Sequence, residues 1–134
     1  MKTRAKLSNA FIFLLLFCFL SNANSQGSKN PLPADQIKDA QSAVAELREL
    51  YKLRDFESGY ETGRKLIEQF PDNTELQAWF ISNMARNEMS KDAVEAAKKL
   101  VENNPENAWA WFVLAHAYVR NLQTTEALPP VKKH

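Results

Sequence analysis

Few side chains in this chain could act as a nucleophile, a general base or a metal ligand. Its 134 residues contain two histidines, His116 and His134, and a single cysteine, Cys18. Catalysis or metal binding needs several such groups converging on one point, and neither histidine has an evident partner. His134 is the last residue printed, a position that would fix no geometry. We therefore predict no enzymatic activity, no metal site and no cofactor.

One set of side chains at helical spacing has the composition of a binding surface. Its four members recur at intervals of three and four and so share one side of a helix: Trp109, Phe112, His116 and Arg120. Tryptophan and arginine are enriched among the residues that dominate binding energies at protein interfaces. The opposite side of the same segment carries Trp111, Leu114 and Tyr118, which we predict to pack within the fold.

The first 25 residues predict a secretory signal peptide. The first six carry three basic residues and no acid, and residues 10–20 are an unbroken apolar run. That run is about half of the roughly 20 residues that span a bilayer, so we favour cleavage over a permanent anchor. Small residues at Ala23 and Ser25 predict cleavage before Gln26, with a cut after Ala23 as the alternative.

Charge and cysteine content narrow the class of partner. The chain has 17 basic and 16 acidic residues, and removal of the three basic residues of the signal leaves 14 against 16. That balance favours neither nucleic acid nor an anionic membrane. Cys18 would leave with the signal, so no thiol or disulfide chemistry is expected afterwards. We predict an exported protein, in a bacterial periplasm or secreted, with no membrane contact after cleavage.

The elements that must position these residues are helices. Residues 26–34 are polar with two prolines and predict a flexible linker. After it, apolar residues recur at spacings of three and four without any period-two alternation, beginning with Ile37, Ala40, Val44, Leu47 and Tyr51. An all-α fold follows.

A period of 34 residues organises the helices. The turns Pro71-Asp72-Asn73 and Pro105-Glu106-Asn107 lie 34 residues apart, and the residues around them match at the same offset. We predict helices over 74–87, 90–103 and 108–120 and a short one starting at Thr125, with N-caps at Asn73, Ser90, Asn107 and Thr124. The result is tandem antiparallel helix hairpins, about five helices plus a short sixth stub that ends before Pro129.

The third copy of the period resembles the tetratricopeptide repeat. Trp111-x2-Leu114-Ala115-x2-Tyr118 followed by Ala127 is similar to that family's pattern W-x2-L-G-x2-Y and then A. The second copy keeps Ala93 and Pro105, and the first copy fits with one residue fewer between its helices. The resemblance covers about 35–128, the predicted repeat domain of an α-solenoid, and leaves 129–134 as a tail.

The resemblance implies a concave groove, lined by the first helix of each repeat, that takes a peptide or helix of a partner protein. The groove residues implied here are Ser82, Arg86, Trp109, Phe112, His116 and Arg120. The Lys and Asn clamp with which some members grip acidic chaperone tails has no match on these helices. Alternatively, Trp109 and Phe112 lie under the tail or against a neighbouring chain.

Three functional interpretations stay open at this point. The first is an exported module for protein–protein interaction. The second is the N-terminal repeat segment of a longer exported enzyme or receptor, suggested by a third repeat that stops halfway. The third is a self-associating structural protein, a homo-oligomer that pairs through its aromatic C-terminal helix.

Overall fold

The computed structural model describes residues 30–126, with side chains up to Thr124. The predicted signal peptide, its cleavage site and the predicted tail lie outside these residues. Five α-helices follow a short 3-10 helix, η1 (Ala34–Gln36), and no strand occurs within the described range. They are α2 (Ala40–Lys52), α3 (Phe56–Gln69), α4 (Thr74–Arg86), α5 (Ser90–Asn103) and α6 (Ala108–Glu126). No helix among these is long and apolar enough to cross a membrane.

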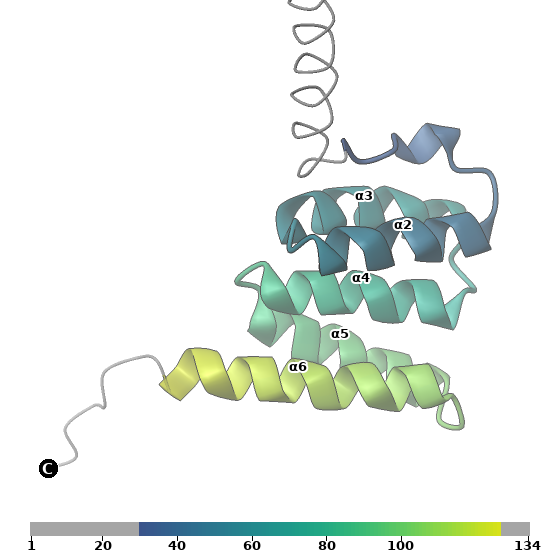
Figure 1. Ribbon diagram of the computed structural model, residues 1–134. Coiled ribbons are helices and arrows are strands. Elements are labelled where there is room, and N and C mark those ends of the chain that lie inside the picture. The colour runs from purple at the N-terminus through teal and green to yellow at the C-terminus, as the bar shows by residue number, and fades with distance from the viewer. Residues whose placement is uncertain (1–29, 127–134) are drawn as a thin grey trace, which may run out of the picture. The chain divides into compact units, whose positions relative to one another are not determined.

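The helices stack as antiparallel hairpins, as Figure 1 shows, with α2 paired to α3 and α4 paired to α5. Helix α4 lies at the centre and packs against α2, α3, α5 and α6. The predicted all-α helical repeat fold of the tetratricopeptide type is therefore confirmed. The 34-residue period is kept throughout, because α2 and α3 begin at Ala40 and Phe56 while α4 and α5 begin at Thr74 and Ser90. The prediction that the first copy has one residue fewer between its helices is therefore wrong.

Each of the hairpin turns between α2 and α3 and between α4 and α5 contains one residue in the left-handed region. Arg54 has a φ of 62° and Glu88 a φ of 60°, and they too lie 34 residues apart. A residue with a side chain adopts this conformation at some energetic cost, which the packing of each hairpin must offset.

Asparagine and aspartate begin most of the helices. The Asn73 side chain accepts a hydrogen bond from the Leu76 backbone N–H at 2.8 Å, and Asn107 accepts one from Trp109 at 2.9 Å. Both caps were predicted. Ser90 was also predicted as a cap, but it is the first residue within α5, and its hydroxyl lies 3.3 Å from the Asn121 side-chain oxygen.

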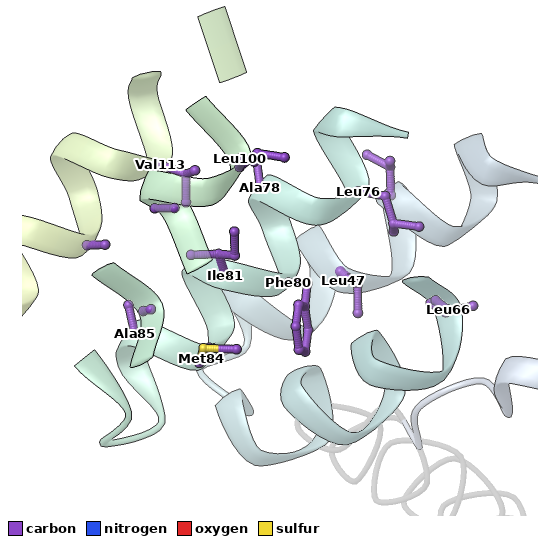
Figure 2. Close-up of a cluster of buried hydrophobic side chains, with 14 of the residues drawn as sticks. Leu47, Leu66, Leu76, Ala78, Phe80, Ile81, Met84, Ala85, Leu100 and Val113 are labelled. Carbon is purple, nitrogen blue, oxygen red and sulfur yellow. The ribbon is translucent and has the colours of Figure 1, made fainter. Parts of the chain in front are cut away.

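The core lies between α4 and its neighbours. Phe80 lies at the centre of this cluster, with Met84 on one side and Leu47 and Leu66 on the other (Figure 2). The Phe80 ring also stacks on Tyr60 with ring centroids 5.6 Å apart. Aliphatic and aromatic side chains that leave water together supply most of the free energy of folding.

Two glycines let α3 and α4 approach closely. A Cβ atom on Gly59 would lie 2.1 Å from the Asn83 side-chain oxygen, and one on Gly63 would lie 2.5 Å from the Phe80 ring. Asn83 is fully buried, and its amide nitrogen donates to the backbone oxygens of Leu47 and Trp79 at 3.2 and 2.9 Å. This side chain therefore ties α2 to α4 across the position that Gly59 leaves open.

The two ends of the repeat domain differ from the prediction. The first helix begins at Ala40, capped by Asp39, and Ile37 is buried in the segment before it. The predicted linker, residues 26–34, includes residues that contact the fold. The Leu32 N–H donates to the buried Glu46 carboxylate at 2.9 Å, and Ala34 is buried at the start of η1. The Gln69 side chain also donates to the Ala34 backbone oxygen at 3.2 Å. The segment before α2 is thus held against the fold by two hydrogen bonds and by the buried side chains of Ala34 and Ile37.

Helix α6 continues where a sixth helix was expected to begin. It runs without interruption to Glu126, and Thr124 lies inside it, its hydroxyl donating to the Arg120 backbone oxygen at 2.9 Å. The predicted stub and its Thr124 cap are therefore wrong. A hairpin turn at this point would need a left-handed residue like Glu88, and no described helix follows α6 to stabilise such a turn.

Candidate functional site

Aromatic side chains from α2, α4 and α6 gather on one side of the domain. We call this side the aromatic face, and its members are Tyr51, Trp79, Trp109, Phe112 and His116. The rings form a chain of contacts with centroids 5.6 to 6.2 Å apart, from His116 through Tyr51, Trp79 and Trp109 to Phe112. These separations suit aromatic pairs. The face is therefore built from side chains that depend on one another for their positions.

The floor of the aromatic face is made by small residues of α4. Ala78 is buried, and Ser82 is only 5% exposed, with its hydroxyl donating to the Ala78 backbone oxygen at 2.9 Å. Both line a shallow hollow that is completed by Trp79, Trp109 and Phe112. Ser82 thus contributes shape to the predicted groove rather than a free polar group.

Trp109 and Phe112 remain open to solvent at this hollow. Their side chains are 37% and 61% exposed, whereas Ala110, Val113 and Ala117 of the same helix are fully buried. An apolar residue this exposed beside other apolar residues marks a site of interaction more often than a lone one does. These two aromatics form the accessible edge of the aromatic face.

His116 joins α6 to α2 across α4. Its Nε2 atom lies 3.3 Å from the Tyr51 hydroxyl, within hydrogen-bond distance. Burial lowers the pKa of His116, and the nearby charges of Arg86 and Arg120 lower it further. The imidazole is therefore neutral at pH 7. No third group that could make this pair a catalytic triad contacts it among the described side chains.

The predicted groove residues are brought together, but two neighbours were missed. Arg86 lies over the Phe56 ring at 4.9 Å, and both Arg86 and Arg120 are close enough to His116 to shift its pKa. Tyr51 was predicted to pack within the fold, and Trp79 was not among the predicted groove residues. An alignment of the first two hairpins without a gap places Tyr51 directly before Lys52, the residue equivalent to Arg86 and Arg120.

The predicted packing stripe of α6 is wrong for Trp111 and Tyr118, whereas Leu114 packs against the core as predicted. Trp111 is 52% exposed and Tyr118 is also exposed, while the residues with no exposure are Ala110, Val113 and Ala117. Trp111 and Tyr118 occupy the motif positions that pack against the second helix of the same repeat. Because no second helix follows α6 within residues 30–126, these side chains remain open.

We expect substitutions in α6 to reflect this correction. Val113→Ala should lower the free energy of unfolding by about 2 kcal/mol, because it removes two fully buried methyl groups. Trp111→Ala should cost about 1 kcal/mol, although it removes many more atoms and the Nε1 hydrogen bond to the Pro105 backbone oxygen, because the side chain is 52% exposed. Urea denaturation of the two variants measures both values. A larger loss of unfolding free energy for Trp111→Ala than for Val113→Ala would show that Trp111 packs within the fold.

The domain has other hollows, and the apolar one formed by α3, α4 and α5 has Phe80 as its aromatic member, which is only 8% exposed. One hollow lies beside the inter-repeat turns and is lined mostly by polar residues: Pro71, Asp72, Thr74, Gln77, Asn103 and Asn104. It contains none of the aromatic side chains that dominate interface energies. Across residues 30–124, no three His, Cys, Asp or Glu side chains come together as metal ligands would. The aromatic face is the best-supported candidate site.

The fold and this face define the class of protein as a helical repeat of the tetratricopeptide type. Residues 96–128 match a family model described as tetratricopeptide repeat, which supports that family for the chain. Repeats of this family generally mediate protein–protein interaction and are typically not catalytic. No curated protein and no solved structure gives a significant match to the chain.

Proposed function

We propose that this chain is an exported module for protein–protein interaction that holds a peptide or helix of a partner protein on the aromatic face. The exposed pair Trp109 and Phe112 carries the proposal, because it borders a hollow between α4 and α6 on the first helices of the repeats. A partner side chain placed there would cover aromatic surface that the fold itself leaves in water. The neighbouring His116 and Tyr51 extend the contact surface toward α2.

The proposed activity is binding without catalysis. The chemical groups of the face are rings, a neutral imidazole and guanidinium groups, and the His116 nitrogen faces a tyrosine hydroxyl rather than a nucleophile held for reaction. Tyr51 and His116 fit a role in shaping the surface, since each also contacts a neighbouring ring or helix. The prediction that no enzyme activity exists is tested by assaying His116→Ala for loss of any turnover that the protein shows.

Phe112→Ala should weaken partner binding by about 2 kcal/mol, the loss expected of an aromatic hot spot. The free energy of unfolding should change by less than about 1 kcal/mol, since the ring is mostly exposed. Binding can be measured by fluorescence anisotropy with a 12-residue peptide selected by the protein from a random display library.

Leu122→Ala is the matched control for Phe112→Ala. Leu122 is 59% exposed on the same helix, but it takes no part in the aromatic face. Its substitution should leave peptide affinity unchanged. Equal losses from both variants, or no loss from Phe112→Ala, would show that peptides bind elsewhere.

Export is part of the proposal and rests on the basic and apolar N-terminal segment, which lies outside the described residues. We propose a bacterial periplasm or the cell exterior as the location. Intact-mass analysis of exported protein should give a chain that begins at or near Gln26. A full-length chain that stays embedded in the membrane would contradict it.

Self-association is a second candidate function, favoured by the outer face of α6. This face consists of exposed residues without a charge: Trp111, Tyr118, Val119 and Leu122. A second copy presents the same apolar side chains, so two copies could pair through them, with Lys98, whose Nζ lies 5.9 Å from the Tyr118 ring centroid, at the edge of the contact. Light scattering over a range of concentrations should then show a dimer that Leu122→Glu converts to a monomer. A concentration-independent monomer would exclude this candidate.

A further inference from the structure

Three buried N–H donors near the aromatic face have no hydrogen-bond acceptor. They are Nε1 of Trp79 and the Nε atoms of Arg86 and Arg120. Buried polar groups are nearly always paired in native proteins, so each such group calls for an explanation. All three of these groups donate, and therefore the missing partner must supply acceptors.

The two guanidinium groups also lack a negative counter-charge. Arg86 lies over the Phe56 ring, and Arg120 donates through Nη1 to the neutral Gln123 side chain at 2.6 Å. Neither forms an ion pair with a carboxylate of the described residues, whereas Lys52 lies 3.9 Å from Glu49. Because His116 is neutral, the charge that remains around it at neutral pH is that of the two arginines.

The helix dipole explains the presence of a cation at only one of the two arginine positions. Arg86 lies in the last turn of α4, where a cation interacts favourably with the helix dipole. Arg120 is the equivalent residue one period later, but α6 continues for six more residues, to Glu126, so Arg120 lies inside its helix. The dipole effect is confined to the last turn and cannot explain the second arginine.

The chemistry that satisfies the two guanidinium groups beside the aromatic rings is a carboxylate next to an apolar side chain. Carboxylate oxygens accept hydrogen bonds without donating, and charge-assisted bonds to arginine are about twice as strong as neutral ones. The aromatic rings of Trp109 and Phe112 would cover the apolar neighbour at the hollow. Charge complementarity therefore selects an acidic segment over a neutral or basic one.

Resting on the proposed function, we propose that the partner segment is acidic: an Asp or Glu side chain accepts hydrogen bonds from Arg86 and Arg120 while an apolar side chain next to it covers Phe112. This assigns the two arginines to recognition and gives the aromatic face one chemical class of occupant. The acid comes from within a peptide chain, and the apolar neighbour distinguishes it from a free anion.

The experiment uses the full chain to select 12-residue peptides from a random display library, followed by synthesis of the best binder. The selected sequences should carry Asp or Glu within a few residues of an aromatic residue or leucine. Replacing that Glu by Gln should weaken binding about tenfold, the loss expected for a charged hydrogen bond. Arg120→Gln should weaken the Glu peptide about tenfold and the Gln peptide by less than about threefold.

Two further variants keep the test specific. Lys52→Gln changes the equivalent cation on α2, which is exposed and paired with Glu49, and it should leave the affinity unchanged. If Arg120→Gln fails to fold, Arg120→Lys replaces it, and it should keep part of the preference for Glu over Gln because it keeps the charge.

The outcomes separate this inference from the proposed function. Peptides without an acid whose binding still depends on Phe112 would overturn the acidic segment and leave the aromatic face as the binding site. Peptides whose binding depends neither on Phe112 nor on Arg120, or the absence of any selected peptide, would overturn both. Binding of free acetate or phosphate with the same affinity as the peptide would also contradict the inference.

Discussion

Replacing Phe80 by alanine is expected to lower the free energy of unfolding by about 3–5 kcal/mol. Its ring fills the centre of the core between α4, α3 and α2, where it contacts the position of Gly63 and stacks on Tyr60. The surrounding helices can collapse only partly into the space, because α4 is held by four neighbours. Guanidinium denaturation followed by far-ultraviolet circular dichroism measures the change.

The control for Phe80→Ala is the same substitution at a phenylalanine that is exposed to solvent. Phe112 is 61% exposed, so its replacement by alanine removes little buried surface and should cost less than about 1 kcal/mol. The comparison holds the chemistry of the substitution constant and changes only burial. Similar losses at the two positions would mean that the aromatic face belongs to the core.

Gly59→Ala is expected to destabilise the domain by about 2 kcal/mol or more, although alanine is the better helix former. The added methyl group would overlap the Asn83 side chain, whose carbonyl oxygen lies 2.1 Å from the ideal Cβ position. Asn83 cannot move aside at low cost, because it is fully buried and donates to two backbone oxygens. Thermal unfolding of the variant tests the expected loss.

A double-mutant cycle with Asn83→Ala identifies the cause of that loss. Asn83→Ala alone should destabilise the domain by removing two buried hydrogen bonds and leaving a cavity. In the double variant the new methyl group has room, so the combined loss should fall short of the sum by about 1 kcal/mol or more. Losses that simply add would show that the two side chains do not compete for the same space.

Much of the fold could be predicted from the sequence, because the 34-residue period and its turns are local features. Pro71 and Pro105 cannot continue a helix, and Asn73 and Asn107 cap the helices that follow. These residues act within one turn of their own positions. Helices α4 and α5 therefore begin and end within one residue of the prediction.

The side of α6 that packs could not be predicted in the same way. Trp111 and Tyr118 match a motif whose burial depends on a second helix, and within the described residues that helix does not form. Ala110 and Ala117 carry no hydrophobic signal comparable to a tryptophan, yet their small size lets α6 approach its neighbours. Burial at the end of a repeat array is decided by the neighbouring helix, which the motif alone does not reveal.

The candidate site was predicted in part for a related reason. Helical spacing was enough to group Trp109 with Phe112 and His116, because all three lie on one helix. Tyr51 comes to the same face from α2, and its contact with His116 spans 65 residues of sequence. Only the stacking of the repeats brings these two together.

The closeness of Trp79 and Trp109 also gives the protein a built-in optical reporter. The chain has three tryptophans, and two of them have ring centroids 6.2 Å apart at the hollow between α4 and α6. Coupled indoles at this distance should give a near-ultraviolet dichroism signal that changes when a ligand alters their tilt. In a Trp111→Phe variant all indole emission would come from this pair, so occupancy of the face could be followed without a label.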